Sequence, residues 1–538
     1  MKANPSGVGA EALEKPGSLQ SLLASAVSRN GLAGVGVAVV TLGAGPETVC
    51  SGLANVRAGR PVDPDTVFRI ASVTKTMTAI GLMRLYDDGR FQLDDPVNDY
   101  LKTFRIQPPP GGVDVTFRHL LTHTAGIGQL PKLADVVRPT AWGRVRPGSR
   151  GASLAKLYRG VLRPEVKAGT KWAYANHGFA VVGQLVEDIS GVPLPEYMRE
   201  NVFRPLGMTS TDYLRTPEAD ARMATGYAMR MGRLKAARDF DLGSLLGAGA
   251  VRSTVSDMTR YAEGLLRTFT GEDEHLLRKE TLAEMWSTQF TPDPRIPGMG
   301  LAFFLHTFDD HRVVGHDGNE PGFASSLMIA PEDRTAVVVL TNTTTTFGAP
   351  ILAEAILRDQ LDLPDANSCL PRPDVPEQPA LWNDLIGYYA PQPGLLTNVR
   401  TWMLLAGEAH VLIKHGHLIV RALSPLPELR TGVQLYPVDR QDPTLFAVNA
   451  GGMLVPVAFN RPTRDQVGAM CIGHPLLSAL QRRPWWRSSN VQLRVGIAIA
   501  VASAWFRSKK HPCSSQLAAR SSTSADLGPR GWGWSGHS

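Results

Sequence analysis

The stretch Ser72-Val73-Thr74-Lys75 opens a predicted helix. It is an S-x-x-K motif, and positions three apart are neighbours on a helix, so the Lys75 amine is expected beside the Ser72 hydroxyl. A serine hydroxyl is a good nucleophile only when its proton is removed as it attacks. A solvated lysine titrates near 10.4, so a lysine base at neutral pH requires a drop of roughly three units, or about 4 kcal/mol. Alone the motif is weak, because a surface serine and a solvated lysine often share this spacing by chance.

A second motif, Tyr174-Ala175-Asn176, precedes a segment with helical periodicity. A phenol can relay a proton to or from Lys75, and the Asn176 amide can accept from the lysine and donate to a substrate carbonyl. A helix-entry asparagine with a packed tyrosine explains the same residues without chemistry.

A third motif, Gly315-His316-Asp317-Gly318-Asn319, lies in a predicted strand. A strand edge can place a backbone N–H beside an acyl carbonyl, and with the N–H of Ser72 it would form a two-donor oxyanion hole. In other hydrolases the loss of one such donor costs roughly 3–4 kcal/mol. A metal ligand or a loop His-Asp pair is the alternative, although no H-x-x-x-H or paired cysteine accompanies the motif.

The three motifs in this order, separated by 102 residues (72 to 174) and 142 residues (174 to 316), are far more specific than any one of them. At this point the sequence resembles the β-lactamase-related family, which includes class C β-lactamases, D-alanyl-D-alanine carboxypeptidases and type VIII esterases. The resemblance covers about residues 17–358. Four further stretches strengthen it: Phe68–Ala71, Thr116–Gly126, Pro205–Met208 and Gly249–Thr254.

The resemblance implies acyl transfer through a covalent ester on Ser72 at an ester, amide or lactam carbonyl. Lys75 and Tyr174 would move the proton, and the backbone amides of Ser72 and Asn319 would hold the oxyanion. Asn176, His316 and Gly318 would complete the substrate site, and no metal or organic cofactor is implied. A scaffold or binding protein that keeps the fold without turnover is the alternative from another class, and the presence of Ser72, Lys75, Tyr174 and Asn176 together favours the enzyme.

The third motif departs from the family pattern at one position. Where β-lactamases usually carry Lys-Thr-Gly, this sequence has His316-Asp317-Gly318. A lysine is a permanent cation suited to a substrate carboxylate, whereas a histidine side chain titrates near 6.5 and is mostly neutral at pH 7. The substitution favours esterase, amidase or peptidase activity over efficient β-lactam hydrolysis. His123 and His177, which accompany motif segments, are predicted to be structural.

Strand and helix patterns predict an α+β fold. Valine-rich runs at 35–42 and 48–56 flank a Gly-Ala-Gly-Pro turn and predict a hairpin. Four strands are expected between about 299 and 341, and helices at 75–86, 177–190, 193–202, 255–268 and 350–360. Strands at both ends with helices between them predict an antiparallel sheet that joins the N-terminal and C-terminal segments and carries helices on both sides.

The domain organisation follows from composition. We expect a flexible N-terminus (1–16), a catalytic domain (17–360), a proline-rich linker (361–380), a small β-barrel-like accessory domain (381–480), a basic and apolar segment (481–510) and a disordered tail (511–538). The accessory domain would narrow the catalytic cleft or mediate association, and the sequence does not decide between these roles.

Charge is concentrated at the C-terminal end. The net charge is +7, but residues 481–538 carry nine Lys or Arg against one Asp, so the preceding residues sum to −1. This balance argues against a nucleic-acid partner. No apolar secretory run is visible near the N-terminus, and the four cysteines form no pairing pattern, so a cytoplasmic location is expected. Residues 482–510 contain a Trp pair and a twelve-residue apolar run, which is short of a span and compatible with peripheral membrane contact or with a last helix on the folded body.

Overall fold

The computed structural model describes residues 19–130, 135, 137–149, 151–345, 348–391, 394, 405, 407–424, 426–450, 452–461 and 468–488. Contacts divide the chain into one unit that ends at Pro484 and another that begins at Trp485. The elements below belong to the first unit; in the second, the structure describes a 3-10 turn at Trp485–Arg487. The predicted flexible N-terminus, the disordered tail and most of the 482–510 segment lie outside the described residues.

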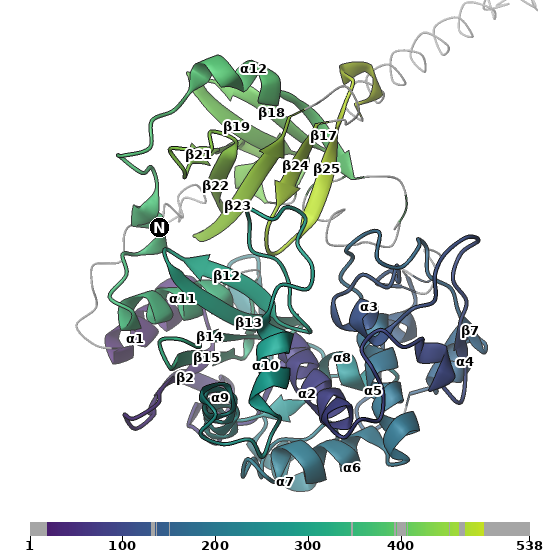
Figure 1. Ribbon diagram of the computed structural model, residues 1–538. Helices are drawn as coiled ribbons and strands as arrows, with labels where there is room; N and C mark the ends of the chain where they lie inside the picture. Colours follow the sequence, from purple (N-terminus) through teal and green to yellow (C-terminus); the bar gives the residue numbers. More distant parts are fainter. Residues whose placement is uncertain are drawn as a thin grey trace, which may run out of the picture. The chain divides into compact units, whose positions relative to one another are not determined.

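A seven-stranded sheet forms the centre of the catalytic region (Figure 1), with the strand order β12-β13-β14-β15-β1-β2-β3. β1 pairs antiparallel with β15, from Val35 opposite Thr341 to Thr41 opposite Thr335, so the two ends of the region meet in one sheet as predicted. The strands are β1 (Gly34–Thr41), β2 (Glu47–Asn55), β3 (Arg60–Pro61), β12 (Phe304–Phe308), β13 (His311–Glu320), β14 (Phe323–Ala330) and β15 (Thr335–Thr341).

Helices cover both faces of this sheet, which confirms the predicted fold class. Successive side chains of a strand point to opposite faces. On β1, Val37 packs in a cluster with helices α1 (Leu19–Asn30) and α11 (Gly348–Gln360), whereas Ala38 packs on the other face with α2 (Thr74–Asp87) and α9 (Val255–Thr270). The second face holds the larger core, and the catalytic motifs lie on that side.

The central helix α2 is buried on every side over most of its length, rather than along one stripe. Its three internal threonines reach polar partners. The Thr78 hydroxyl lies 2.7 Å from the Tyr213 hydroxyl, Tyr261 donates to Thr76, and the Val251 N–H donates to Thr74. Because these hydroxyls are hydrogen-bonded, α2 can run through the core at small energetic cost.

Apart from helix α5, the remaining elements of the catalytic region are short. Its helices are α3 (Phe117–Leu121), α4 (Leu154–Tyr158), α5 (Asn176–Ser190), α6 (Leu194–Met198), α7 (Pro217–Arg222), α8 (Leu246–Gly249) and α10 (Lys279–Trp286), with 3-10 turns at Ala71–Val73 (η1), Val97–Asp99 (η2) and Pro139–Trp142 (η4) and a π-helical turn at Arg199–Phe203 (η5). Its small strands are β4 (Phe68–Arg69), β5 (Arg105–Ile106), β6 (Arg144–Val145), β7 (Val161–Leu162), β8 (Tyr227–Arg230), β9 (Arg233–Ala236), β10 (Asp241–Leu242), β11 (Arg252–Ser253) and β16 (Thr343–Thr344). The helix predicted at 193–202 is thus an α-helix that continues as a π-helical turn.

The accessory region is a nine-stranded, nearly closed antiparallel barrel with the order β20-β19-β18-β17-β25-β24-β23-β22-β21 (Figure 1), which confirms the predicted barrel. Its strands are β17 (Gly387–Pro391), β18 (Ala409–Lys414), β19 (His417–Ala422), β20 (Val433–Gln434), β21 (Tyr436–Pro437), β22 (Leu445–Ala450), β23 (Met453–Asn460), β24 (Ala469–Ile472) and β25 (Ser478–Arg483). Helices α12 (Trp382–Leu385) and α14 (Pro427–Thr431) accompany them. Between the two regions, 3-10 turns form at Ala366–Cys369 (η6) and Pro379–Leu381 (η7), and the domain boundaries stay a prediction.

The barrel is joined to the catalytic region by a polar contact centred on Arg295. Its guanidinium pairs with Asp293 of the catalytic region at 2.8 Å and donates to Asp442 at 3.0 Å and to Thr444 at 2.7 Å in the barrel.

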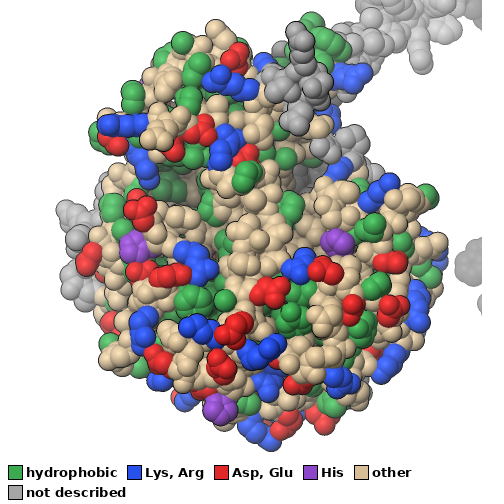
Figure 2. Space-filling view, in the orientation of Figure 1, with side chains coloured by type: hydrophobic (Ala, Val, Ile, Leu, Met, Phe, Trp, Pro, Cys, Tyr) green, Lys and Arg blue, Asp and Glu red, His purple; other side chains and the backbone are tan. Residues whose placement is uncertain are grey.

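On the face shown in Figure 2, Lys or Arg and Asp or Glu side chains are interspersed. Within the described residues, no helix is long and apolar enough to cross a bilayer.

Candidate active site

Ser72 lies on a sharp turn between strand β4 and helix α2. The preceding residue, Ala71, has φ of 45°, a left-handed conformation that is rare for a residue with a side chain and is often found at functional sites. The turn is held by Ile70, whose N–H donates to Val251 at 3.2 Å and whose carbonyl accepts from the Ser325 hydroxyl at 2.8 Å. Ser72 therefore enters the first helical turn with a backbone N–H that the helix itself does not use.

Lys75 is fully buried directly beside Ser72. Its Nζ lies 3.0 Å from the Ser72 hydroxyl and donates to the Ala248 carbonyl at 2.5 Å. Helix α8 can bring this carbonyl close because Gly247 packs on α5, where a Cβ at Gly247 would lie 2.6 Å from the Phe179 carbonyl oxygen. Burial disfavours the ammonium while the carbonyl favours it. The amine can thus exchange a proton with the serine hydroxyl over one hydrogen bond.

Tyr174 covers Lys75 from the other side. The centre of its ring lies 4.9 Å from the Lys75 Nζ, and the tyrosine is 2% exposed. The His123 ring packs 4.4 Å from the tyrosine ring, and its Nδ1 accepts the N–H of Ala175 at 3.2 Å. His123, predicted only as structural, therefore supports the backbone and the ring on which the phenol depends.

Strand β13 lies against the Ser72 turn, and part of its outer edge is unpaired within the described residues. β12 pairs with β13 only as far as Phe304 opposite Gly315, and beyond that point the structure, in its described part, pairs His316–Glu320 with β14 alone. A Cβ at Gly318 would lie 2.3 Å from the Ile70 carbonyl oxygen and 3.2 Å from the Ala71 Cβ. Only glycine lets the strand come this close to the serine turn.

The register of β13 also sets the direction of its amides. Glu320 pairs with Phe323 across the two-residue turn that contains Gly322, and hydrogen-bonded and non-hydrogen-bonded pairs alternate along such a ladder. This alternation directs the N–H of Asn319 away from β14, toward the free edge, while its side chain donates to the Thr345 carbonyl. Asn176 is half-buried at the first residue of α5. Within the described contacts, neither asparagine side chain is linked to Ser72 or Lys75.

His316 lies on the same face of β13 as Gly318 and is almost completely buried. Its Nδ1 is 2.7 Å from the carbonyl oxygen of Asp317. A carbonyl oxygen only accepts, so Nδ1 carries a proton. An imidazole thus stands where the lysine of the family pattern would place a permanent cation.

A family model described as Beta-lactamase matches residues 19–360, more than half of the chain. The chain belongs to the Beta-lactamase family. This Beta-lactamase-family chain is 28% identical to the D-alanyl-D-alanine-carboxypeptidase/endopeptidase AmpH of Escherichia coli (strain K12) over 58% of its length and 80% of the relative's. It is 24% identical to penicillin-binding protein 4* of Bacillus subtilis (strain 168), over 71% of its own length and 86% of the relative's.

Among solved structures, SurE with D-Leu matches with 25% identity and a TM-score of 0.54, and the match covers 86% of this chain and 98% of SurE. Across the first curated relatives, the chain spans between 58% and 81% of the relative's own length. As a Beta-lactamase-family member with these relatives, the chain is a serine hydrolase.

A buried charged network, not predicted from the sequence, anchors both sides of this Beta-lactamase-family site. Arg69 of β4 contacts Asp239 at 2.6 Å and approaches the Glu320 carboxylate at the end of β13 to 3.8 Å, an ion-pair distance. Burial raises the pKa of Glu320, and Arg69 and Arg252 oppose that rise. The network ties the strand before Ser72 to the strand that carries Gly318.

The sequence motifs and the structure agree on which elements meet. The structure brings Ser72, Lys75 and Tyr174 together and sets Gly318 against the serine turn. His177 is fully buried between the Tyr158 hydroxyl at 2.9 Å and the Ala141 carbonyl at 3.0 Å, a structural environment.

Proposed function

We propose that Ser72 is the acylated nucleophile of this hydrolase and that Lys75 and Tyr174 handle its proton. The observation that carries the proposal is the 3.0 Å contact between the Lys75 Nζ and the Ser72 hydroxyl, with the Tyr174 ring 4.9 Å from the same nitrogen. Ser72 and Lys75 lie three residues apart at the start of one helix, and Tyr174 comes from a distant part of the chain.

In acylation, Ser72 Oγ forms a bond to the substrate carbonyl carbon while its proton passes to the neutral Lys75 amine. When the tetrahedral intermediate collapses, the bond to the leaving group breaks, its electron pair stays on the leaving atom, and Tyr174 donates a proton to that atom. Lys75 returns its proton to the phenol oxygen. Water then attacks the acyl ester by the reverse proton path and restores Ser72.

The backbone amides of Ser72 and Asn319 would hold the developing oxyanion. The orientation of the Asn319 N–H toward the free edge of β13 and the close approach of Gly318 to Ala71 support this assignment. Preorganised donors of this kind stabilise charge that appears only in the transition state. Asn176, at the start of α5, would bind the substrate carbonyl or amide.

The substrate class we propose is an ester, amide or small peptide, rather than a β-lactam that is bound through its carboxylate. His316 stands where β-lactamases usually carry a lysine, and an imidazole is not the permanent cation that a substrate carboxylate favours. AmpH is a D-alanyl-D-alanine carboxypeptidase/endopeptidase and SurE was solved with D-Leu, which favours substrates that contain D-amino acids.

A fluorophosphonate probe tests the assignment of Ser72. Labelling of the wild type that is lost in Ser72→Ala supports it, whereas a folded wild type that takes no label would point to a catalytically silent scaffold. A panel with a chromogenic cephalosporin, a short-chain nitrophenyl ester and a D-alanyl dipeptide then ranks the substrate classes. Preferential turnover of the cephalosporin would contradict the role given to His316.

For location, we propose a cytoplasmic protein with peripheral membrane contact through residues 482–510, whose tryptophans and arginines suit an anionic bilayer surface. Flotation with anionic vesicles is expected for the full chain and not for a chain that ends at residue 481. Equal behaviour of the two chains would contradict membrane contact.

A further inference from the structure

One loop of the accessory barrel reaches the catalytic site. Gly473–Leu477 connects strands β24 and β25, and it is closed by its own backbone, since the N–H groups of Leu476 and Leu477 both donate to the Gly473 carbonyl at 3.0 Å. Leu477 has φ of 41°, a left-handed conformation that is costly for a residue with a branched side chain. The loop thus holds the backbone of Leu477 in a conformation that leucine rarely adopts.

That leucine belongs to the same buried apolar cluster as Tyr174. Leu477 is completely buried, and it forms a cluster with Trp172, Tyr174, Met299 and Phe304, all of which belong to the catalytic region. The neighbouring Leu476 is also buried, but it packs in the barrel core. Two adjacent leucines therefore serve different regions, and of these two it is Leu477 that shares a cluster with Tyr174.

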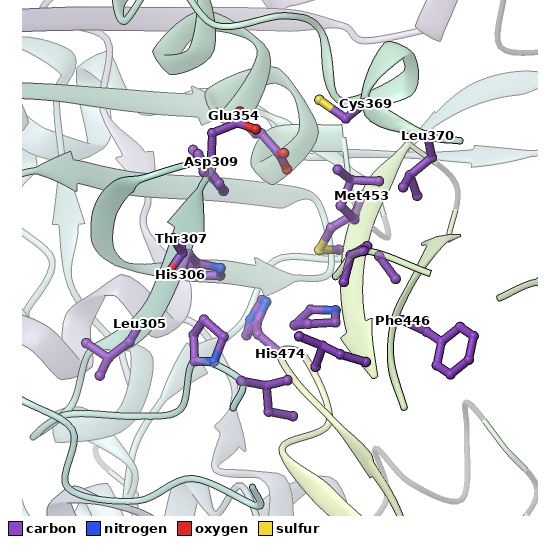
Figure 3. A pocket seen from close by; sticks show the side chains of 18 of the residues that line it. Leu305, His306, Thr307, Asp309, Glu354, Cys369, Leu370, Phe446, Met453 and His474 are labelled. Carbon is purple, nitrogen blue, oxygen red and sulfur yellow. The ribbon is translucent and has the colours of Figure 1, made fainter. Parts of the chain in front are cut away.

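The same loop is anchored beside the substrate-facing strand. The His474 ring packs at a tilt on Phe304, with ring centres 4.3 Å apart, and lies 4.9 Å from the His306 ring. Its Nε2 is 3.6 Å from the Asp317 carboxylate. Figure 3 shows His474 and His306 among the residues that line a cavity of about 290 Å³ between β12 and the barrel strands β22 and β23. These contacts fix the loop on β12 and β13, so Leu477 has a defined position.

Tyr174 is consequently held between two supports. The centre of the His123 ring lies 4.4 Å from the centre of the Tyr174 ring and forms one support. The other members of the cluster that contains Leu477 form the second support. A ring that is packed in this way keeps its hydroxyl at one position relative to Lys75. Removal of one support allows the ring to tilt and changes the distance over which the phenol must transfer a proton.

We propose that Leu477 is a positioning residue for Tyr174: the accessory barrel, through this side chain, holds the phenol where it returns a proton to the leaving group. This inference rests on the proposed function of Tyr174. It predicts that loss of the Leu477 side chain harms substrates in proportion to how much their leaving group needs a proton. A 4-nitrophenolate leaves without one, whereas an unsubstituted phenolate benefits from protonation.

The test compares 4-nitrophenyl acetate with phenyl acetate, which share an acyl group and differ little in size. In Leu477→Ala, kcat/KM for phenyl acetate is expected to fall about tenfold more than that for 4-nitrophenyl acetate, through kcat rather than KM, a share of the usual contribution of general acid catalysis. Leu477→Met, which refills the space, is expected to restore the ratio of the two rates to within about twofold of wild type. Leu476→Ala is the matched control, and it is expected to leave that ratio unchanged.

A folded Leu477→Ala variant with the wild-type ratio would overturn the proposal, as would an equal change of the ratio in Leu476→Ala. If Leu477→Ala does not fold, Trp172→Phe thins the same cluster from the catalytic side and carries the same expectation. Fluorophosphonate labelling separates a failure of this proposal for Leu477 from a failure of the proposed function. Wild-type labelling that depends on Ser72, with an unchanged ratio, refutes only the role of Leu477, whereas absent labelling refutes the proposed function as well.

Discussion

Acid should destabilise the catalytic region through His177, at the second residue of α5. The Ala141 carbonyl lies 3.0 Å from His177 Nε2, so that nitrogen carries the proton, and the Tyr158 hydroxyl donates to Nδ1 at 2.9 Å. Both ring nitrogens are satisfied in the neutral form. Burial lowers the pKa of His177 to about 4, and the Ala141 carbonyl opposes that shift. Protonation would make Nδ1 a donor, so the Tyr158 hydroxyl would have to change from donor to acceptor, and it would place a charge in the core.

The sign of the effect follows from this depressed pKa. The unfolded chain binds the proton near pH 6.5 and the folded chain only near pH 4, so His177 contributes stability above 6.5 that is lost as the pH falls toward 4. Between pH 7.5 and pH 4.5 the expected loss is about 2.5 kcal/mol, since each unit corresponds to about 1.4 kcal/mol. The contribution becomes constant only about one unit below the folded pKa, where the histidine is protonated in both states.

Urea denaturation of wild type and His177→Gln at the two pH values measures this loss. Glutamine can donate to Ala141 and accept from Tyr158 but does not titrate, and the carboxylates that titrate in the same range are common to both proteins. The stability advantage of the wild type at pH 7.5 is therefore expected to shrink by about 2.5 kcal/mol at pH 4.5. A stability advantage that stays constant with pH would show that His177 does not titrate with the depressed pKa described above.

Three further variants test other parts of the structure. Gly318→Ala would place a Cβ 2.2 Å from the Ser325 hydroxyl and 2.3 Å from the Ile70 carbonyl oxygen. Fluorophosphonate labelling of Ser72 is therefore expected to slow at least about tenfold. Gly45→Ala, whose Cβ would point into open space, is the control and is expected to keep the wild-type rate. His316→Lys is expected to lower KM for a D-alanyl dipeptide with a free carboxylate about tenfold, because the lysine makes a charge-assisted contact with that carboxylate. His316→Gln cannot make this contact and is the control. An unchanged KM in His316→Lys would contradict the role given to His316. Arg295→Ala removes the contacts with Asp442 and Thr444, so calorimetry is expected to show a loss of about 1–3 kcal/mol, whereas Arg312→Ala, which breaks an exposed pair with Glu332, costs less than about 1 kcal/mol.

Local patterns predicted the elements that carry the site, because hairpins, strand runs and S-x-x-K are written in consecutive residues. The β1–β2 hairpin, β13 and helix α5 lie within a residue or two of the expected ranges. Helix α10 was missed, and the continuation of α6 as a π-helical turn has no signal in hydrophobic periodicity. The left-handed backbone at Ala71 and Leu477 could not be predicted either, since both residues ordinarily avoid it and only the surrounding contacts impose it.

Contacts between residues far apart in the sequence were the other feature that the sequence did not predict. Leu477 shares a cluster with Tyr174 across about three hundred residues of sequence. Nothing in Gly473-His474-Pro475-Leu476-Leu477 distinguishes the leucine of that cluster from the one inside the barrel. Arg69 and Glu320 likewise belong to different motif regions, and their approach depends on β4 and β13 lying on either side of Ser72. Such pairings are a property of the assembled fold.

The unequal lengths of β12 and β13 explain why the active edge and the barrel meet at one place. β12 begins at Phe304, opposite Gly315, so the ladder stops where the substrate-facing half of β13 begins. The chain just before β12 leaves the sheet, and Met299 and Phe304 turn their side chains into the cluster that receives Leu477. A longer β12 would pair with the amides of His316–Glu320 and close the edge that a substrate needs. The early end of the strand therefore opens the edge, and it leaves an apolar flank beside Tyr174 that the barrel loop buries.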